Sequence, residues 1–324
     1  SWLADGFAAG MRVAVAGTGS NVTGDNVYLT VASVSVSSLV LATYERLIDE
    51  TGVSVRISGG NTASVQAIRV SQVDDIDIDA TGALGGIVGG QAYVGSEQSI
   101  GLDQFAVGGD VRIKSAIGIT NQALADAVNV SGTSLILEAS DGDAGAADKP
   151  LTIDLDDAAA SALLTARAQN GIHVTEVSGD MRLATIYAKT GAIRLEAREG
   201  SILDGLNQAF TNIQGASIQL LAGLSVGGIG GIGTAANPLD LDASGSGLFS
   251  AHAQASIYVI DTAGNANLGA VMSRTGDVSL SAPVSILDGA DLLDPYNPDS
   301  LVDASVPASN PRADIIGNNI LLSA

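Results

Sequence analysis

The sequence predicts an all-β protein: a right-handed parallel β-helix (β-solenoid) preceded by a small antiparallel β-barrel or sandwich module. Two observations predict the β-helix. A strand-like sequence motif recurs about every 21 residues. In addition, the segment 163–197 is repeated at 248–282. The composition is the third observation, because 40 glycines, 46% apolar residues and only 3% aromatic residues suit many thin, similar layers.

The segment 1–57 differs from the rest of the chain. It contains four or five short segments in which apolar and polar residues alternate, separated by the turn-like sequences "GTGSN" and "TGDN". The strand-like motif does not recur at a regular interval in this segment. We therefore expect a separate small antiparallel β module at 1–57, which joins the β-helix near the word "RISGGN".

The β-helix is expected to occupy residues 58–324. Its recurring word is a glycine, one or two residues, and then apolar residues at alternate positions, as in "GDVRIKS", "GAIRLEA" and "GDVSLSA". This alternation is typical of a strand with one buried face. In "GAIRLEA", Ile193 and Leu195 should point inward, and Arg194 and Glu196 outward.

The spacing of these words determines the predicted architecture. Between Val111 and Val278, the intervals between successive equivalent positions are 24, 18, 19, 21, 25, 21, 18 and 21. Antiparallel hairpins would return after about 8 to 12 residues, whereas about 20 residues make one coil of a parallel β-helix, about 4.8 Å from the next. The region therefore has room for about a dozen coils.

A longer repeat is superimposed on the coils. Residues 163–197 match residues 248–282 at 12 of 35 positions without a gap. An internal duplication explains this match. Because four successive intervals bridge the offset between the two copies, we expect the long repeat to be four coils. The segment 290–313, rich in Pro, Asp and Ser, is expected to leave the coil as a loop.

The charge of the chain excludes some partners. With 35 acidic and 14 basic residues, the formal net charge is −21, so phosphate backbones and anionic membrane surfaces should repel it. We expect no nucleic-acid partner. No apolar run approaches the roughly 20 residues of a membrane-spanning helix, so no membrane insertion is expected either.

The chain has no cysteine and only two histidines, which argues against disulfides, thiolate metal sites and multi-histidine sites. The best metal candidate is the word "DGDAGAADK", where Asp141, Asp143 and Asp148 could offer oxygen ligands to Ca²⁺. It lacks the patterns of known calcium loops, and a solvated acidic loop is the alternative. The acidic strand words "TIDLDD" and "LDLDA" are interpreted as solvated faces. No other cofactor is expected.

The words "TGDVSLSA", "SILDG", "IIGNNILLSA" and "NPLDLDASGSGLFSAHAQASIYV" together resemble β-helix repeats of filamentous-haemagglutinin-like giant bacterial surface proteins and adhesins, over roughly 109–324. The N-terminal words "DGFAAGMRVAVAGTGSN" and "VYLTVASVSVSSLVL" are similar to a small β module of such proteins. The resemblance implies export, a cell-surface or extracellular location, and adhesion or filament building. It brings no catalytic residue.

We therefore expect a non-enzymatic structural or adhesive segment of a large secreted bacterial surface protein. Its expected partners are neighbouring repeats or subunits of the same protein, and possible further partners are cell-surface or matrix glycans. The end of the chain at "ILLSA" leaves two options, a parent protein that continues or a docking site for another subunit. Two alternatives stay open: a polysaccharide lyase or glycosidase, which needs a carboxylate pair in a groove, and a calcium-dependent filament subunit.

Overall fold

The computed structural model describes residues 9, 12–16, 29–35, 38–41, 56–59, 76–80, 82–124, 127–156, 162–289 and 314–324. The described secondary structure consists of strands. The chain divides into two compact units, Ser1–Asp75 and Ile76–Ala324, here called the N-terminal domain and the solenoid.

The N-terminal domain contains an antiparallel sheet with strand order β3-β2-β1-β4. Its strands are β1 (Arg12–Ala16), β2 (Leu29–Val34), β3 (Leu39–Leu41) and β4 (Arg56–Gly59). Val13 and Val31 are buried in its small core. The antiparallel pairing agrees with the prediction, whereas closure into a barrel or sandwich stays a prediction.

The predicted boundary at residue 57 differs from the structure. It would cut through β4, which pairs with β1, and the N-terminal domain extends to Asp75. The word "RISG" alternates like any strand, and this pattern does not tell which neighbouring strand it will pair with.

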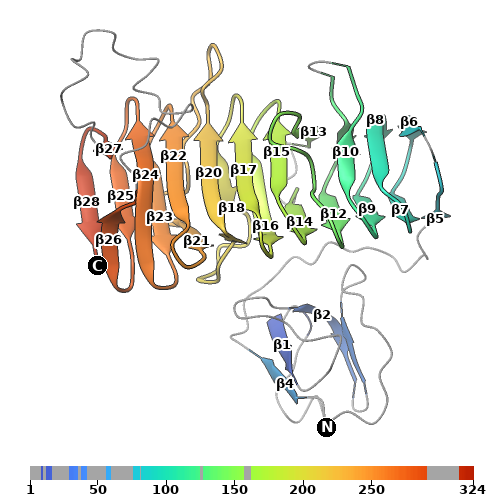
Figure 1. Ribbon diagram of the computed structural model, residues 1–324, viewed down its shortest axis with the longest axis horizontal. Helices are drawn as coiled ribbons and strands as arrows, with labels where there is room; N and C mark the ends of the chain where they lie inside the picture. Colours follow the sequence, from blue (N-terminus) through green and yellow to red (C-terminus); the bar gives the residue numbers. More distant parts are fainter. Residues whose placement is uncertain are drawn as a thin grey trace. The chain divides into compact units, whose positions relative to one another are not determined.

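The solenoid consists of two parallel sheets, each of twelve strands, and the chain passes back and forth between them (Figure 1). Sheet I contains β5 (Ile76–Asp77), β7 (Ala92–Ser96), β9 (Val111–Ser115), β12 (Leu135–Ala139), β14 (Leu164–Ala168), β16 (Met181–Ala188), β18 (Ile202–Asp204), β19 (Ile213–Gly215), β21 (Leu239–Ala243), β23 (Ile257–Asp261), β25 (Val278–Ser281) and β28 (Ile320–Ser323). Sheet II contains β6 (Ala83–Val88), β8 (Ile100–Val107), β10 (Ile119–Asn121), β11 (Val130–Gly132), β13 (Leu151–Leu155), β15 (Ile172–Glu176), β17 (Ala192–Ala197), β20 (Ser217–Ala222), β22 (Leu248–Ala253), β24 (Asn265–Ser273), β26 (Ser285–Asp288) and β27 (Ile315–Ile316).

The parallel β-solenoid predicted from the sequence is therefore confirmed, with about nine turns in place of a dozen. The estimate of a dozen assumed that every residue from 58 onward enters a coil of the regular length. The solenoid begins at Ile76, and several coils are longer because they carry insertions. The right-handed sense stays a prediction.

Apolar side chains from successive turns stack inside the solenoid. On sheet II, Ile172, Ile193, Ile218, Phe249 and Leu268 lie in register, and each is at most 2% exposed. This stacking removes each aliphatic side chain from water and pairs the backbone of every turn with the next. The prediction that alternate residues of "GAIRLEA" point inward is confirmed by the burial pattern of β17.

The long repeat is three and a half turns, not four. Leu164 and Phe249, which occupy the same place in the two copies of the repeat, lie in β14 of sheet I and β22 of sheet II. Three turns on sheet I lead from β14 through β16 and β19 to β21, and half a turn more reaches β22. The two strands of one turn carry the same alternating pattern, so spacing alone did not reveal the exchange of sheets.

Among the described residues, the first two repeats contain eight strands each, and each begins with a long strand. The first repeat runs from β8 to β15 and the second from β16 to β23, and a third begins at β24. Each long strand is followed by two short partners, β10 and β11 on β8, β18 and β19 on β16, and β26 and β27 on β24. The chain between the two short partners is an insertion into a single turn.

The predicted loop 290–313 lies outside the described residues. The strands on both sides of it keep their register, because Asn265 pairs with Ser285 and Val271 pairs with Ile315 on the same strand, β24. Strands β26 and β27 thus pair with two successive parts of β24, as the short partners do on β8 and β16 in the earlier repeats.

Candidate functional site

A group of buried polar side chains closes the base of the insertion in the first repeat. Asn129 is fully buried, and its Nδ2 donates a hydrogen bond of 2.9 Å to Oδ1 of Asn121. Its Oδ1 accepts a hydrogen bond of 2.8 Å from the backbone N–H of Thr152 in the next turn. We call Asn121, Asn129 and Thr152 the first clasp.

The second repeat contains the same arrangement with different residues. Nδ2 of Asn212 donates to Oδ1 of Asp204 at 2.8 Å, and Oδ1 of Asn212 accepts from the backbone N–H of Asp240 at 3.1 Å. The backbone N–H groups of Leu206 and Gln208 also donate to the Asp204 carboxylate, at 2.9 and 3.0 Å. We call Asp204, Asn212 and Asp240 the second clasp.

The second clasp differs from the first in its electrostatics. Asp204 and Asp240 are 7% and 6% exposed, where the first clasp has the neutral Asn121 and Thr152. Burial, and secondarily the Asp204 charge, raise the pKa of Asp240 to about 7. Among the described residues, no salt bridge reaches either carboxyl.

A further buried carboxyl lies on the neighbouring strand β23. Asp261 is 2% exposed; its Oδ1 accepts from the backbone N–H of Ala263, and its Oδ2 has no hydrogen-bond partner. Burial raises the pKa of Asp261 to about 6, and the Asp242 charge acts in the same direction. The interpretation of "LDLDA" as a solvated face was therefore wrong, because Asp240 and Asp242 are buried between neighbouring turns.

The calcium candidates Asp141, Asp143 and Asp148 are all exposed. Asp143 uses Oδ1 to accept a hydrogen bond of 2.6 Å from the backbone N–H of Gly171 in the next turn. The adjacent Ala144 forms parallel bridges to Ile119 and Ile172, so the segment is part of sheet II. In the part of the chain that the structure describes, no group of three or more His, Cys, Asp or Glu residues could hold a metal ion.

The second repeat builds the same turn without these carboxyl groups. The words "DAGAADKPLTI" from Asp143 and "GIGTAANPLDL" from Gly231 align without a gap, and Ile232 bridges Ile202 and Ile257 as Ala144 bridges its neighbours. Gly231 and Ala236 take the places of Asp143 and Asp148. The second repeat therefore forms the same bridges without the two acidic side chains.

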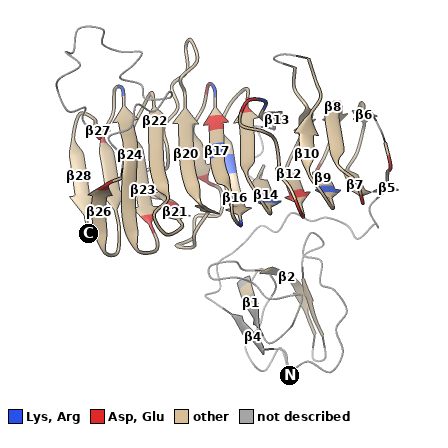
Figure 2. Cartoon of the chain, viewed as in Figure 1, with Lys and Arg blue, Asp and Glu red and all other residues tan. Residues whose placement is uncertain are grey.

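Charged residues are scattered along the described ribbon of the solenoid, most of which is formed by uncharged residues (Figure 2). Arg194 donates to Glu196 at 2.8 Å on β17, and Arg112 pairs with Glu138 at 2.7 Å between β9 and β12. The Arg112–Glu138 pair is largely buried, with side chains 5% and 15% exposed, whereas the side chains of Arg194 and Glu196 are 16% and 24% exposed. The sequence prediction that Arg194 and Glu196 point outward is confirmed by the burial pattern of β17.

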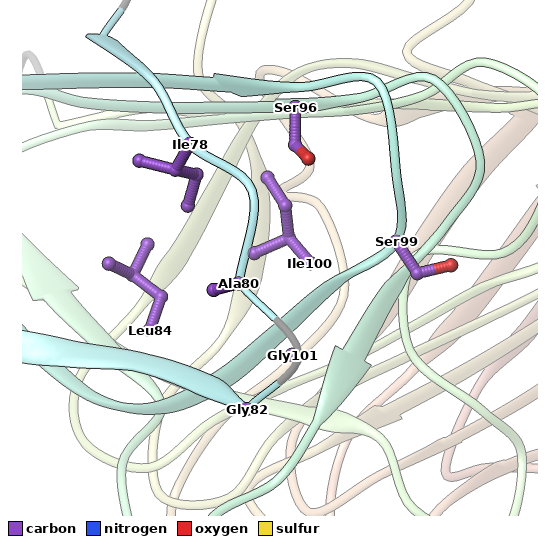
Figure 3. Close-up of a pocket in the computed structure, with 8 residues that line it drawn as sticks. All are labelled: Ile78, Ala80, Gly82, Leu84, Ser96, Ser99, Ile100 and Gly101. Carbon is purple, nitrogen blue, oxygen red and sulfur yellow. The ribbon is translucent and has the colours of Figure 1, made fainter.

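A shallow hollow lies where the described solenoid begins, between the segment that follows β5 and strands β6, β7 and β8 (Figure 3). Ile78, Leu84 and Ile100 face a common space, whereas the Ser99 side chain points away from it. Ala80, Gly82, Ser96 and Gly101 complete the lining. The lining contains no acid, base or histidine, so the hollow is an end of the apolar core and has no group for acid–base chemistry.

The sequence reasoning missed the clasps. A signal for them exists in the words "NVSG" at 129 and "NIQG" at 212, where asparagine precedes a short strand in both repeats. Buried asparagine is costly unless all its polar atoms are bonded, which is why the recurrence is informative.

The fold places the chain in the class of parallel β-solenoid proteins. No protein-family description matches the sequence, and comparisons with curated proteins and with solved structures gave no significant match. Among the described residues, no helix is long and apolar enough to cross a membrane.

Proposed function

We propose that the chain is a structural or adhesive segment of a large secreted bacterial surface protein, with an extracellular or cell-surface location. The observation that carries the proposal is the uninterrupted parallel pairing of each solenoid sheet, from β5 to β28 and from β6 to β27. The backbone hydrogen bonds run along the stacking direction, and each turn buries its apolar side chains against the next. Such an array suits a load-bearing or spacing element.

The described sites support a non-enzymatic role. A lyase or glycosidase would need a carboxylate pair at about 5–10 Å in a groove open to a sugar chain. The neighbouring carboxyls Asp204 and Asp240, and likewise Asp242 and Asp261, are buried, and the hollow at Ile78 has no titratable side chain. Neighbouring repeats or subunits of the same protein are the partners that this stacking favours, and cell-surface or matrix glycans are the ligands of an adhesive variant of the proposal.

The test is immunogold electron microscopy of intact and of sectioned cells that produce the native protein, with antibodies raised against the purified chain. We expect gold particles on fibres or on the outer surface, and none in pre-immune controls. Labelling confined to the cell interior would refute the proposal. Degradation of bacterial or plant polysaccharides by the purified chain would instead favour the alternative that the chain is a polysaccharide lyase or glycosidase.

A further inference from the structure

The two clasps form a comparison within one molecule. Both use a buried asparagine as the central residue, with one hydrogen bond across the insertion and one to the next turn. The bond lengths across the insertion are nearly equal, 2.9 Å at Asn129 and 2.8 Å at Asn212. Only the second clasp has carboxyl groups, Asp204 and Asp240, at positions where the first has Asn121 and Thr152.

The described strands that pack against the strand of Asp240 carry no positive charge. Strands β18, β19 and β23 pack against β21. The titratable residues of these strands are Asp204, Tyr258 and Asp261, and β21 itself adds Asp242. None of the four strands carries Lys, Arg or His. An ionised Asp240 would therefore lie in a buried site with the Asp204 carboxyl nearby, and its charge would be unfavourable there.

We propose that the second clasp is a proton-dependent lock, which holds the 205–212 insertion firmly at acidic pH and loosens as the pH rises to neutrality, whereas the first clasp is insensitive to pH. In the locked state Asp240 is a neutral carboxylic acid, buried in the second clasp. Opening of the clasp brings water to Asp240, which then ionises as an ordinary aspartate.

The direction of the effect follows from linkage. The pKa of Asp240 is about 7 in the folded protein and near its ordinary value of 3.8 when the clasp is open. The stabilisation of the closed state is complete below pH 3.8 and is lost as the pH rises towards 7, by at most about tenfold in the opening equilibrium per pH unit. Above pH 7 no further loss occurs.

Hydrogen exchange of the full-length chain tests the lock between pH 5 and pH 7, with rates corrected for intrinsic exchange. The reporters are the amides of Leu206, Gln208 and Asp240, all hydrogen-bonded within the second clasp. We expect their protection to fall by about tenfold or more over this range. The corresponding amides of the first clasp, Ala123 and Thr152, should keep constant protection.

Substitutions separate the lock from a general effect of pH. Asp240→Asn should remove most of the fall in protection between pH 5 and pH 7, because the neutral amide cannot ionise and only the smaller contribution of Asp261 is left. The double variant Asn121→Asp, Thr152→Asp should give the first clasp the pH dependence of the second. Equal pH dependence of both clasps, a constant second clasp, or an unchanged fall in Asp240→Asn would overturn the proposal. If the double variant does not fold, the comparison of wild type with Asp240→Asn still tests the proposal.

Discussion

Asn212 and Asp204 are joined by a hydrogen bond of 2.8 Å that bridges the two ends of the second insertion, and Asn129 makes the corresponding bond of 2.9 Å to Asn121 in the first. The asparagine is the shared element, since its amide is both donor and acceptor and can bond two turns at once. A carboxylate or an amide can act as the acceptor on the other side of the insertion.

Replacement of Asn212 by alanine should lower the free energy of unfolding by about 2–3 kcal/mol. The substitution removes the donor to Asp204 and leaves the backbone N–H of Asp240 without its acceptor in a buried place. Chemical denaturation measures the loss. Asn170 is exposed, and Asn170→Ala should change the stability by less than about 0.5 kcal/mol. Similar losses in both variants would show that the clasp contributes nothing specific.

Replacement of Leu195 by aspartate should cost about 4 kcal/mol or more, because a carboxyl would be buried without a partner. Leu195 is fully buried and stacks on Val174 and Leu220 of the neighbouring turns. The matched control is Gln219→Asp, which lies on the outer face beside Arg194 and should be tolerated. Thermal unfolding of both variants compares the two faces, and full stability of Leu195→Asp would contradict the facing assignment.

The sequence was sufficient to predict the coil and the direction of its side chains. Both depend on local alternation: inward positions such as Ile193 and Leu195 must be apolar in every turn, and this leaves a regular pattern. Because strands of both sheets show the same alternation, the sequence did not indicate which strand belongs to which sheet. Ile218 and Leu239 look like successive equivalents, but one lies in sheet II and the other in sheet I.

The candidate site was harder to predict, because burial on the outer face depends on neighbouring turns. Asp240 and Asp154 occupy similar alternating words, but Asp240 is buried under the second insertion and Asp154 is only half-buried. The contacts that decide this come from residues many positions away, such as Asp204 and Asn212. The sequence of a single strand does not contain that information.

Gly233→Ala should destabilise the solenoid by about 3 kcal/mol. Gly233 has φ +60°, in the left-handed region, and a Cβ there would collide with the carbonyl oxygen of Tyr258 in the next turn. Gly227 also has a positive φ, of +86°, but its added Cβ would meet nothing within 4 Å. Gly227→Ala should therefore cost only about 1–2 kcal/mol, the backbone strain alone. The denaturation midpoints of the two variants distinguish the steric collision of the Cβ from backbone strain. Equal losses of stability in both variants would show that the collision contributes nothing.

His252 should destabilise the protein in acid. It is 6% exposed between Leu221 and Met272 on sheet II, and its Nε2 has no hydrogen-bond partner. Burial, and secondarily Arg274, lower its pKa to about 4 from 6.5, so its contribution to stability is present above pH 6.5 and is lost as the pH falls towards 4. Wild type should lose about 2 kcal/mol more than His252→Leu between pH 7.5 and pH 5.

The raised pKa values of Asp240 and Asp261 act in the opposite direction over the same pH range, since protonation of these groups favours the folded state. The measurement must therefore compare the variant with wild type at each pH, and the pH dependence of wild type alone does not report on His252. A difference that stays constant with pH would show that His252 is already accessible to protons in the folded protein.

Removal of calcium should leave the melting temperature unchanged to within about 1 °C, whereas a site saturated at a hundred times its Kd would contribute about 2.7 kcal/mol. The turn with Asp143 and Asp148 has the same backbone as the turn with Gly231 and Ala236, and Asp143 already bonds the N–H of Gly171. Asp143→Ala should cost about 1 kcal/mol with or without chelator, through loss of that bond. Asp148→Ala should have no effect. A fall in melting temperature with chelator that disappears in Asp148→Ala would instead establish a calcium site in this turn.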